Sequence, residues 1–276
     1  MTVRDVIELV KAQYPPQDVQ HTCDTVKGGN TGVCCTGVSV TCSPTVEAIR
    51  RTAELGDNLL ICHEALYYNH ADETDWLTGD PVFEAKRRLV AETGIVIWRN
   101  HDHIHGDPPG VPQRRAADGI FYGIMKELGW ENYLIGDPKK PLLYRIPKCT
   151  ARKLADELAE KLNLNGLRVV GDLCAPVETV CFCEHVWPAD EKGPTRLARE
   201  VGADAYIPLE IIDWTLSAYI RDACQMEQKK VILEMGHFNV EELGMRHLAK
   251  QLSRVLPENI PVHFVQSGDS YQYLIR

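Results

Sequence analysis

The amino-acid sequence predicts an α/β protein made of two alternating α/β domains. Three observations predict this class. Short apolar runs, such as residues 59–62, recur along the chain and have the length and composition of buried strands. Amphipathic stretches separate these runs, and residues that start and stop helices bound them. Residues 147–150 interrupt the series, which then begins again, so we place a domain boundary there.

The composition is that of an ordinary globular protein. The 276 residues are 44% hydrophobic and 25% charged, which allows a sizeable core. A net charge of −9 argues against a polyanion-binding surface, so nucleic acid is a disfavoured partner. No apolar run approaches the roughly 20 residues of a membrane span, and the amino terminus lacks the apolar segment of a secretion signal. We therefore expect a cytoplasmic protein with no membrane partner, whose ten cysteines are free thiols.

The first domain is predicted to open with a helix over residues 2–14, which two prolines end. Residues 33–41 predict a strand. Ser43 and Pro44 then start a helix that Gly56 stops. The buried strand at residues 59–62 follows. This order is a β-α-β unit, whose crossover is expected to be right-handed.

The same pattern continues through the rest of the first domain. Residues 81–93 predict a helix that begins at a proline, and residues 95–98 predict the next buried strand. Residues 106–115 are rich in proline and glycine and predict an exposed loop or lid. A helix over residues 117–128 and a strand over residues 142–146 complete this part.

The second series alternates in the same way. In order, we expect a helix that begins at Thr150, strands at 167–171 and 178–183, a helix at 194–201, a strand at 205–209, a helix at 213–224, a strand at 231–234, a helix to residue 252 and a strand at 262–264. Cys181, Cys183 and His185 are the one cysteine cluster with ligand character. Alternating small residues of a strand explain it better than a zinc site, because no second cysteine pair lies at zinc-ribbon spacing.

Histidines and carboxylates follow three of the predicted buried strands. In open α/β sheets the carboxyl ends of the strands are where ligands bind. Each group also has a structural explanation when taken alone: a core histidine, a polar loop or an acidic helix start. Three such groups together favour a metal site. They are His63 and Glu64 after residues 59–62, then His101, Asp102 and His105 after residues 95–98, and His237 and Glu241 after residues 231–234.

The donor chemistry indicates two ions. His237 and Glu241 are four residues apart and share one face of a helix. Imidazole and carboxylate donors suit zinc, manganese or iron better than calcium. Five or more protein ligands exceed the three that one catalytic ion usually takes. A pair of divalent ions lowers the pKa of water and so supplies a nucleophile near neutral pH.

These motifs resemble the Nif-three-like family (Ngg-interacting factor three), dinuclear-metal proteins also labelled type-2 GTP cyclohydrolase I. The family pattern has a buried strand that ends in His-His-Pro, where this chain has His63-Glu64-Ala65. The family's carboxy-terminal Gly-His-x-x-x-Glu matches residues 236–241, and its His-x-x-x-Asp element matches the spacing of His101 and His105. The resemblance spans most of the chain and is strongest at residues 32–105 and 230–250.

The chain departs from the family pattern at two positions. Glu64 stands where the family has a second histidine, and His105 stands where it has the metal-binding aspartate. The two exchanges leave the net charge of the site similar. The alternative is that Asp102 fills the missing aspartate position and that the loop shifts its register.

The resemblance also implies an architecture. It implies a metal-site domain of residues 1–147 plus 231–276 and a smaller domain of residues 148–230, so that the last segment returns to the first domain. It further implies a toroidal homohexamer.

For function, the resemblance implies two divalent ions and a metal-dependent hydrolase that acts on a small molecule, with a nucleotide such as GTP as the substrate class. Asp102, or else His101, would act as general base or orient a ligand, and loss of Glu241 should abolish turnover. Arg99, Arg114 and Arg115 are candidates to bind phosphate, although a solvated loop face explains them somewhat better. The rival interpretation is a non-catalytic metal-binding scaffold or a ring-shaped adaptor. The metal-ligand candidates are His63, Glu64, His101, His105, His237 and Glu241.

Overall fold

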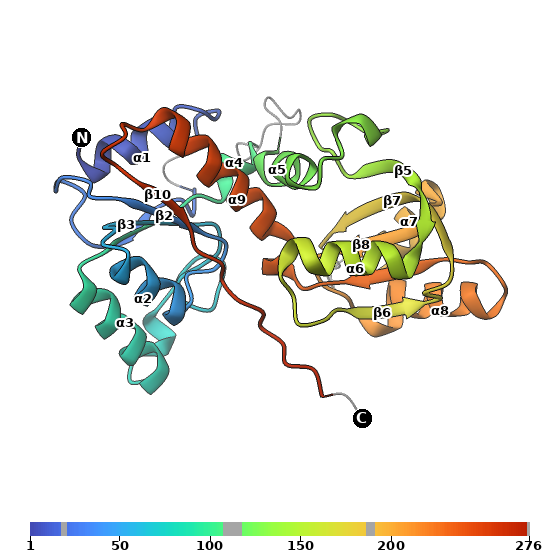
Figure 1. Cartoon of the computed structure of the whole chain (residues 1–276). Helices are drawn as coiled ribbons and strands as arrows, with labels where there is room; N and C mark the ends of the chain where they lie inside the picture. Colours follow the sequence, from blue (N-terminus) through green and yellow to red (C-terminus); the bar gives the residue numbers. More distant parts are fainter. Residues whose placement is uncertain (18–20, 107–117, 186–190, 275–276) are drawn as a thin grey trace. The chain divides into compact units, whose positions relative to one another are not determined.

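The structure, a computed structural model, describes residues 1–17, 21–106, 118–185 and 191–274. The chain divides into two compact units. The first unit consists of Met1–Ile124 and Glu241–Ser267, and the second of Met125–Val240 and Gly268–Arg276. Each unit contains one five-stranded sheet with helices packed against it (Figure 1). The predicted class, two alternating α/β units, is therefore confirmed.

The first sheet is almost entirely parallel. Its order is β1-β4-β3-β2-β10, and only β1 runs antiparallel to its neighbour. All residues of β2, β3 and β4 are buried. β3 is accordingly a continuous apolar run, whereas β2 and β4 also bury the polar side chains of Ser39, Thr41 and Arg99. The strands are β1 (Val26–Gly28), β2 (Val38–Thr41), β3 (Leu59–Cys62), β4 (Val96–Arg99) and β10 (Val262–Phe264).

Helices cover both faces of this sheet. Figure 1 shows α2 and α3 on one face and α1 and α9 on the other. The α2–α3 face buries Leu60, Ile97 and Phe83 in one apolar cluster. Thr45 caps α2 through its hydroxyl, where the sequence had suggested Ser43 as the start. The helices are α1 (Val3–Lys11), α2 (Val46–Glu54), α3 (Pro81–Thr93), α4 (Asp102–His105), α5 (Gly119–Leu128) and α9 (His237–Val255).

Two glycines let α5 and α9 cross with their backbones in contact. A Cβ atom on Gly123 would lie 2.7 Å from the Cα of Gly244, and one on Gly244 would lie 2.7 Å from the Cα of Ile120. Real Cβ atoms do not approach so closely, so only glycine fits at either position. Glu241 lies three residues before Gly244, so this crossing fixes the position of Glu241 in the first unit.

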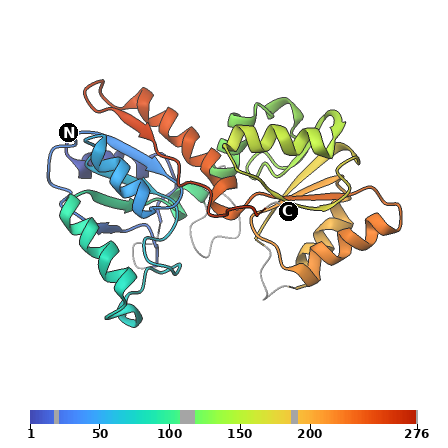
Figure 2. The same ribbon diagram turned by 60° about the horizontal axis from the view of Figure 1, so that its bottom comes forward.

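The second sheet has the order β5-β7-β8-β9-β6, in which β7, β8 and β9 are parallel and both edge strands are antiparallel. Figure 2 shows α6 on one face and α7 and α8 on the other. The elements are β5 (Leu143–Thr150), α6 (Ala151–Leu162), β6 (Arg168–Gly171), β7 (Pro176–Glu184), α7 (Gly193–Val201), β8 (Ala205–Pro208), a π-type turn (Asp213–Ser217), α8 (Ala218–Gln225) and β9 (Val231–Glu234), with short 3-10 turns at Asp75–Leu77 and Glu131–Tyr133.

The structure divides the chain at points other than those expected. β9 pairs with β8 and β6, so Val231–Glu234 belongs to the second sheet and not to the metal-site domain. β5 likewise pairs with β7, and so the second unit already begins before residue 147. The chain returns to the first unit inside α9, at Glu241. In the described part of the chain, no helix is both long enough and apolar enough to span a bilayer.

The glycine crossing gives a direct test of this packing. Gly244→Ala should destabilise the protein by about 1–3 kcal/mol, because the added methyl overpacks a contact between two backbones. Ser253→Ala, on the exposed side of the same helix, should change stability far less. Chemical denaturation of both variants measures the difference. Equal stabilities would show that α5 and α9 do not approach as described.

Candidate metal centre

His63 lies at the carboxyl end of β3 and has 0% of its surface exposed. Its backbone N–H donates to the carbonyl of Cys42, and its ring Nδ1 lies 3.2 Å from the carbonyl oxygen of Asn100, just after β4. A carbonyl oxygen can only accept, so Nδ1 must carry a proton. In the neutral ring the lone pair is therefore on Nε2.

The Nε2 of His63 faces a buried carboxylate. It lies 3.4 Å from Oε2 of Glu241, whose side chain is also buried, and it makes no hydrogen bond to any described residue. A lone pair and a carboxylate oxygen repel each other in a buried site unless a cation lies between them or the imidazole takes up a proton. The local chemistry therefore fits a bound cation.

Two further histidines gather around His63. The ring of His101 stacks on it with centroids 4.6 Å apart, and the ring of His105 meets it edge-on at 5.0 Å. The Nδ1 of His101 donates to Asp102 at 3.1 Å, and the Nδ1 of His105 donates to Asp118 at 3.0 Å. Both contacts place the ring's lone pair on Nε2. An acceptor behind each Nδ1 is the arrangement by which proteins orient histidines that bind metals.

His101 is also held in the neutral form that a metal requires. Burial lowers the pKa of His101 to about 4, against the opposing effect of its hydrogen bond to Asp102, and the neighbouring rings of His63 and His105 lower it further. At neutral pH this imidazole therefore carries no net charge. No proton has to be removed from it before it can bind a cation.

The donors form two overlapping groups. One contains His63, Glu64 and Glu241, and the other contains His63, His101 and His105. Within each group, one donor atom from every residue lies within 4.8 Å of the others. Glu64 is the most open carboxylate of the first group, with 15% of its side chain exposed. Five nitrogen and oxygen donors in one place are a set that suits zinc, manganese or iron.

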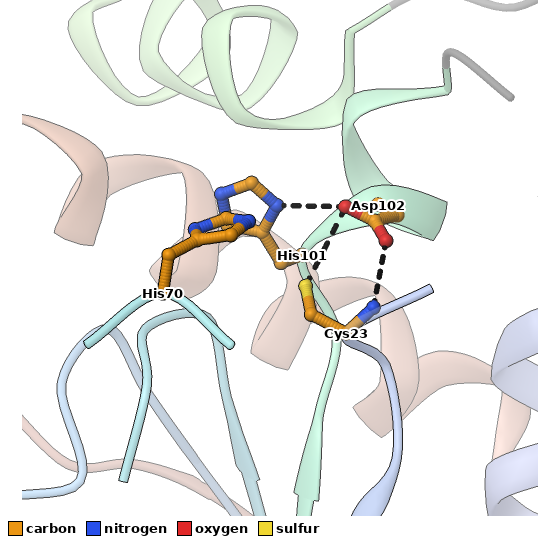
Figure 3. Close-up of side chains that lie close together, drawn as sticks. All are labelled: Cys23, His70, His101 and Asp102. Carbon is orange, nitrogen blue, oxygen red and sulfur yellow. Dashed lines mark hydrogen bonds and ion pairs between the residues drawn. The ribbon is translucent and has the colours of Figure 1, made fainter. Parts of the chain in front are cut away.

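Asp102 supports this centre from behind. Its Oδ2 accepts from the Thr22 hydroxyl at 2.7 Å and from the backbone N–H of Cys23 at 3.0 Å, while Oδ1 faces the Cys23 thiol and the ring of His101 (Figure 3). Burial would raise the pKa of Asp102, but the hydrogen bonds from His101, Thr22 and Cys23 hold it well below its usual range. Such a carboxylate is a weak base. Asp102 therefore positions His101, and the structure does not support it as a general base.

The same geometry separates the two sequence alternatives for the missing aspartate. His105, and not Asp102, shares a donor group with His63. His70 lies against His101 in Figure 3, with ring centroids 4.9 Å apart. Its Nδ1 lies 3.3 Å from Nη2 of Arg99, which can only donate, so its proton is on Nε2. Asp102 and Cys23 are thus hydrogen-bonded to each other beside His101, and His70 contacts the His101 ring edge-on, with its Nδ1 turned to Arg99.

Asp24 anchors the segment that carries His101, a role that no motif in the sequence indicates. Its carboxylate accepts from the backbone N–H groups of His101, Asp102 and His103, and its Oδ2 lies 2.6 Å from Nδ1 of His103. Burial acts to raise the pKa of Asp24, but the hydrogen bonds from His103 and from these backbone groups lower it overall. The short helix α4 is thus fixed by one ionised side chain from a distant loop.

The substrate-binding role suggested for Arg99 is wrong. Arg99 has 0% exposure, and its Nε donates to the carbonyl of His63 at 3.0 Å. Its other nitrogens contact the carbonyl of His70 and lie 3.8 Å from the carboxylates of Glu64 and Asp72. A guanidinium enclosed in this way holds the loop after β3 and cannot meet a substrate. Arg114 and Arg115 lie outside the described residues.

His237 has neighbours other than those expected. The sequence paired it with Glu241, but in the structure its Nδ1 lies 3.4 Å from Oε2 of Glu210, and its ring lies 4.9 Å from that of His185. Glu241 instead belongs with His63 and Glu64. Cys181 and Cys183, the other members of the cysteine cluster, are buried in the apolar core of the second unit, as the strand interpretation predicted.

A family model supports the resemblance drawn from the motifs. The model for Duf34/NIF3 (NGG1p interacting factor 3) matches residues 1–270. The chain belongs to the NIF3 family. No curated protein sequence matches it significantly.

Solved structures, among them one of a protein related to NIF3, share this fold. A Bacillus cereus protein related to NIF3 superimposes with a TM-score of 0.68 at 15% identity, covering 99% of both chains. A Staphylococcus aureus protein gives 0.67 at 16% identity, also covering 99% of both. Reduced HcgD from Methanocaldococcus jannaschii gives 0.61 at 15% identity, covering 98% of both. These likenesses establish the NIF3-like fold of the chain.

The support of His101 by Asp102 can be tested by substitution. Asp102→Asn should weaken metal binding about 10- to 100-fold, the usual cost of losing an acceptor behind a ligating histidine. The number of ions bound at saturation should stay unchanged. Metal titration of both proteins measures the two quantities separately. A lower stoichiometry would instead make Asp102 a ligand.

The anchoring role of Asp24 has a distinct pH signature. Because its folded-state pKa is lowered, its stabilising effect is present above the ordinary carboxyl value of 3.8 and is lost as the pH falls through the folded value. Asp24→Asn should therefore cost about 2 kcal/mol or more at neutral pH. That deficit should shrink as the pH falls below 3.8. A deficit independent of pH, measured by denaturation at a series of pH values, would contradict the charged anchor.

Proposed function

We propose that this NIF3-family protein binds two divalent metal ions in its first unit and uses them to hydrolyse a small molecule. The observation that carries the proposal is the buried pair of His63 Nε2 and Glu241 Oε2, 3.4 Å apart, with the tautomer of His63 fixed by Asn100. With a neutral imidazole the arrangement is unfavourable without a cation and favourable with one. The three other donors, Glu64, His101 and His105, lie within reach of the same place.

The number of donors supports two ions. The Nδ1 of His63 is occupied by a carbonyl, so His63 offers one nitrogen and serves one ion. Five side chains therefore divide into a set of three and a set of two, which leaves coordination positions open for water and substrate. The two donor groups share His63. Imidazole donors suit a zinc-like ion, and a donor set richer in carboxylates suits manganese or iron.

When bound, such ions polarise an electrophilic carbonyl or phosphoryl group and generate a nucleophile from water near neutral pH. The protein residues supply the rest. Glu64 and Glu241 offset the positive charge, and Asp102 and Asp118 hold the rings of His101 and His105 in one tautomer. Arg99 fixes the carbonyl of His63 from below. The departures from the family pattern exchange a histidine and a carboxylate across His63, so the centre keeps a similar charge.

Nucleotides are the first substrates to test, because the sequence resembles proteins labelled as GTP cyclohydrolases. The substrate class is otherwise a carbon or phosphorus centre open to hydrolysis. A hydrolase should lose turnover when an ion ligand is removed while its fold persists. A metal-binding scaffold should hold the same ions without turnover on any substrate.

The experiment begins with metal analysis of the purified protein, followed by a screen of nucleotides and phosphoesters with the metal found. Glu241→Gln should lower the bound metal and reduce turnover by at least about 100-fold, because it removes a charged ligand. Glu258→Gln removes the same charge from an exposed position in the same unit and should change neither. Unchanged metal content in Glu241→Gln would refute the centre. Full metal content with no turnover across the screen would favour the scaffold.

A further inference from the structure

A second group of metal-type donors lies in the second unit, apart from the centre proposed above. His185 directly follows β7, Glu210 comes two residues after the end of β8, and His237 comes three residues after the end of β9. These three strands are parallel neighbours, so their carboxyl ends lie at one edge of the sheet. That edge is the usual position of ligand sites in α/β sheets.

The three side chains converge on one point. Oε1 of Glu210 lies 2.8 Å from Nδ1 of His185, and Oε2 lies 3.4 Å from Nδ1 of His237. One donor atom from each residue lies within 4.8 Å of the others. Oε2 of Glu210 is buried and makes no hydrogen bond to any described residue. A buried carboxylate oxygen in that state, with two imidazoles beside it, is a position for a cation.

The backbone before each histidine adopts a conformation that few residues tolerate. Glu184 has φ of +54°, although it is not glycine, and the register between β7 and β8 shifts at this point. Gly236 has φ of +97°, and a Cβ there would lie 2.9 Å from Oδ1 of Asn239. A left-handed conformation is unfavourable for a residue other than glycine and is found preferentially at functional sites. The residue after each of these positions is a histidine whose Nδ1 faces Glu210.

The donor set and its exposure indicate the class of ligand. Two imidazoles and one carboxylate are the protein ligands of many catalytic zinc ions, which keep one position for water. The side chains of His185, Glu210 and His237 are 33%, 35% and 27% exposed, so an ion can enter from solution. The carboxylate of Glu184 is nearby in sequence, but its charge is paired with Lys140.

We propose that His185, Glu210 and His237 bind one divalent cation of the zinc class in the second unit, in addition to the ions of the first. The cation would take the place of the protons between Glu210 and the two imidazoles. The site would not depend on His63, Glu64 or Glu241, because all three of its ligands belong to the second unit.

The test counts zinc in the full-length protein after metal removal and reloading with zinc alone. Glu210→Gln and His185→Ala should each bind one ion fewer than the unsubstituted protein. The affinity of that position should fall by more than about 100-fold, since a ligand and not merely its support is lost. Glu178→Gln, which removes an exposed charge from β7, is the matched control and should bind as the unsubstituted protein does. His237 is not substituted, because the family pattern links it to Glu241 and its loss would not test the second site alone.

A second pair of variants separates this site from the first centre. His63→Ala should retain the zinc ion of the second unit, and adding Glu210→Gln to it should lower the number of bound ions by one. If the first centre binds nothing, the unsubstituted protein should still hold one ion that Glu210→Gln abolishes, so the two proposals can fail separately. Circular dichroism establishes whether each variant is folded. If Glu210→Gln does not fold, His185→Ala replaces it as the test variant. Unchanged stoichiometry in folded His185→Ala, or loss of all zinc in His63→Ala alone, overturns the proposal.

Discussion

The hydrogen bond from His63 Nδ1 to the carbonyl of Asn100 determines the chemistry of the first unit. It joins the ends of two neighbouring parallel strands, β3 and β4, and it selects one tautomer of a buried imidazole. The opposite nitrogen, Nε2, is thereby directed at Glu241 with a lone pair. A structural histidine would use both nitrogens in hydrogen bonds. This one leaves a buried acceptor beside a carboxylate, which is an arrangement completed by a cation.

The surroundings of His63 are built to keep that arrangement in place. Arg99 is wholly buried and holds the carbonyl of His63, while Lys27 pairs with Asp72 at 2.8 Å close to the same guanidinium. Removing one partner from such a buried ion pair strongly destabilises a protein. These pairs therefore hold the loop after β3 in one conformation. On the other side, Asp24 and Asp118 fix the segments that carry His101 and His105. Preorganised ligands of this kind lose little entropy when an ion binds.

Much of this could be predicted from the sequence, for identifiable reasons. Residues 59–62 form β3 as expected, because a short apolar run between a glycine and a polar cluster has few other interpretations. The rule that polar residues after parallel strands meet at one edge placed His63, His101 and His105 together. Applied to the second sheet, the same rule would have found His185 and Glu210 as well. Both follow parallel strands.

Other features leave no local signal. Asp24 and Asp118 form hydrogen bonds to residues distant in sequence. The pattern of apolar and polar residues does not predict such contacts. Arg99 lies among metal-type residues in the sequence, and an arginine is expected to be exposed. In the structure two carboxylates and two carbonyls enclose it. The division between units was misplaced because β9 resembles any buried strand, and only its pairing with β8 and β6 assigns it to the second sheet.

The most direct measurement of the central claim is a crystal structure of the zinc-loaded protein with anomalous diffraction recorded on both sides of the zinc absorption edge. We predict an anomalous peak bound by His63 Nε2 and the carboxylate of Glu241, with the Nδ1 of His63 still donating to Asn100. No peak at that position, together with a water or a protonated imidazole bridging the two side chains, would contradict the account.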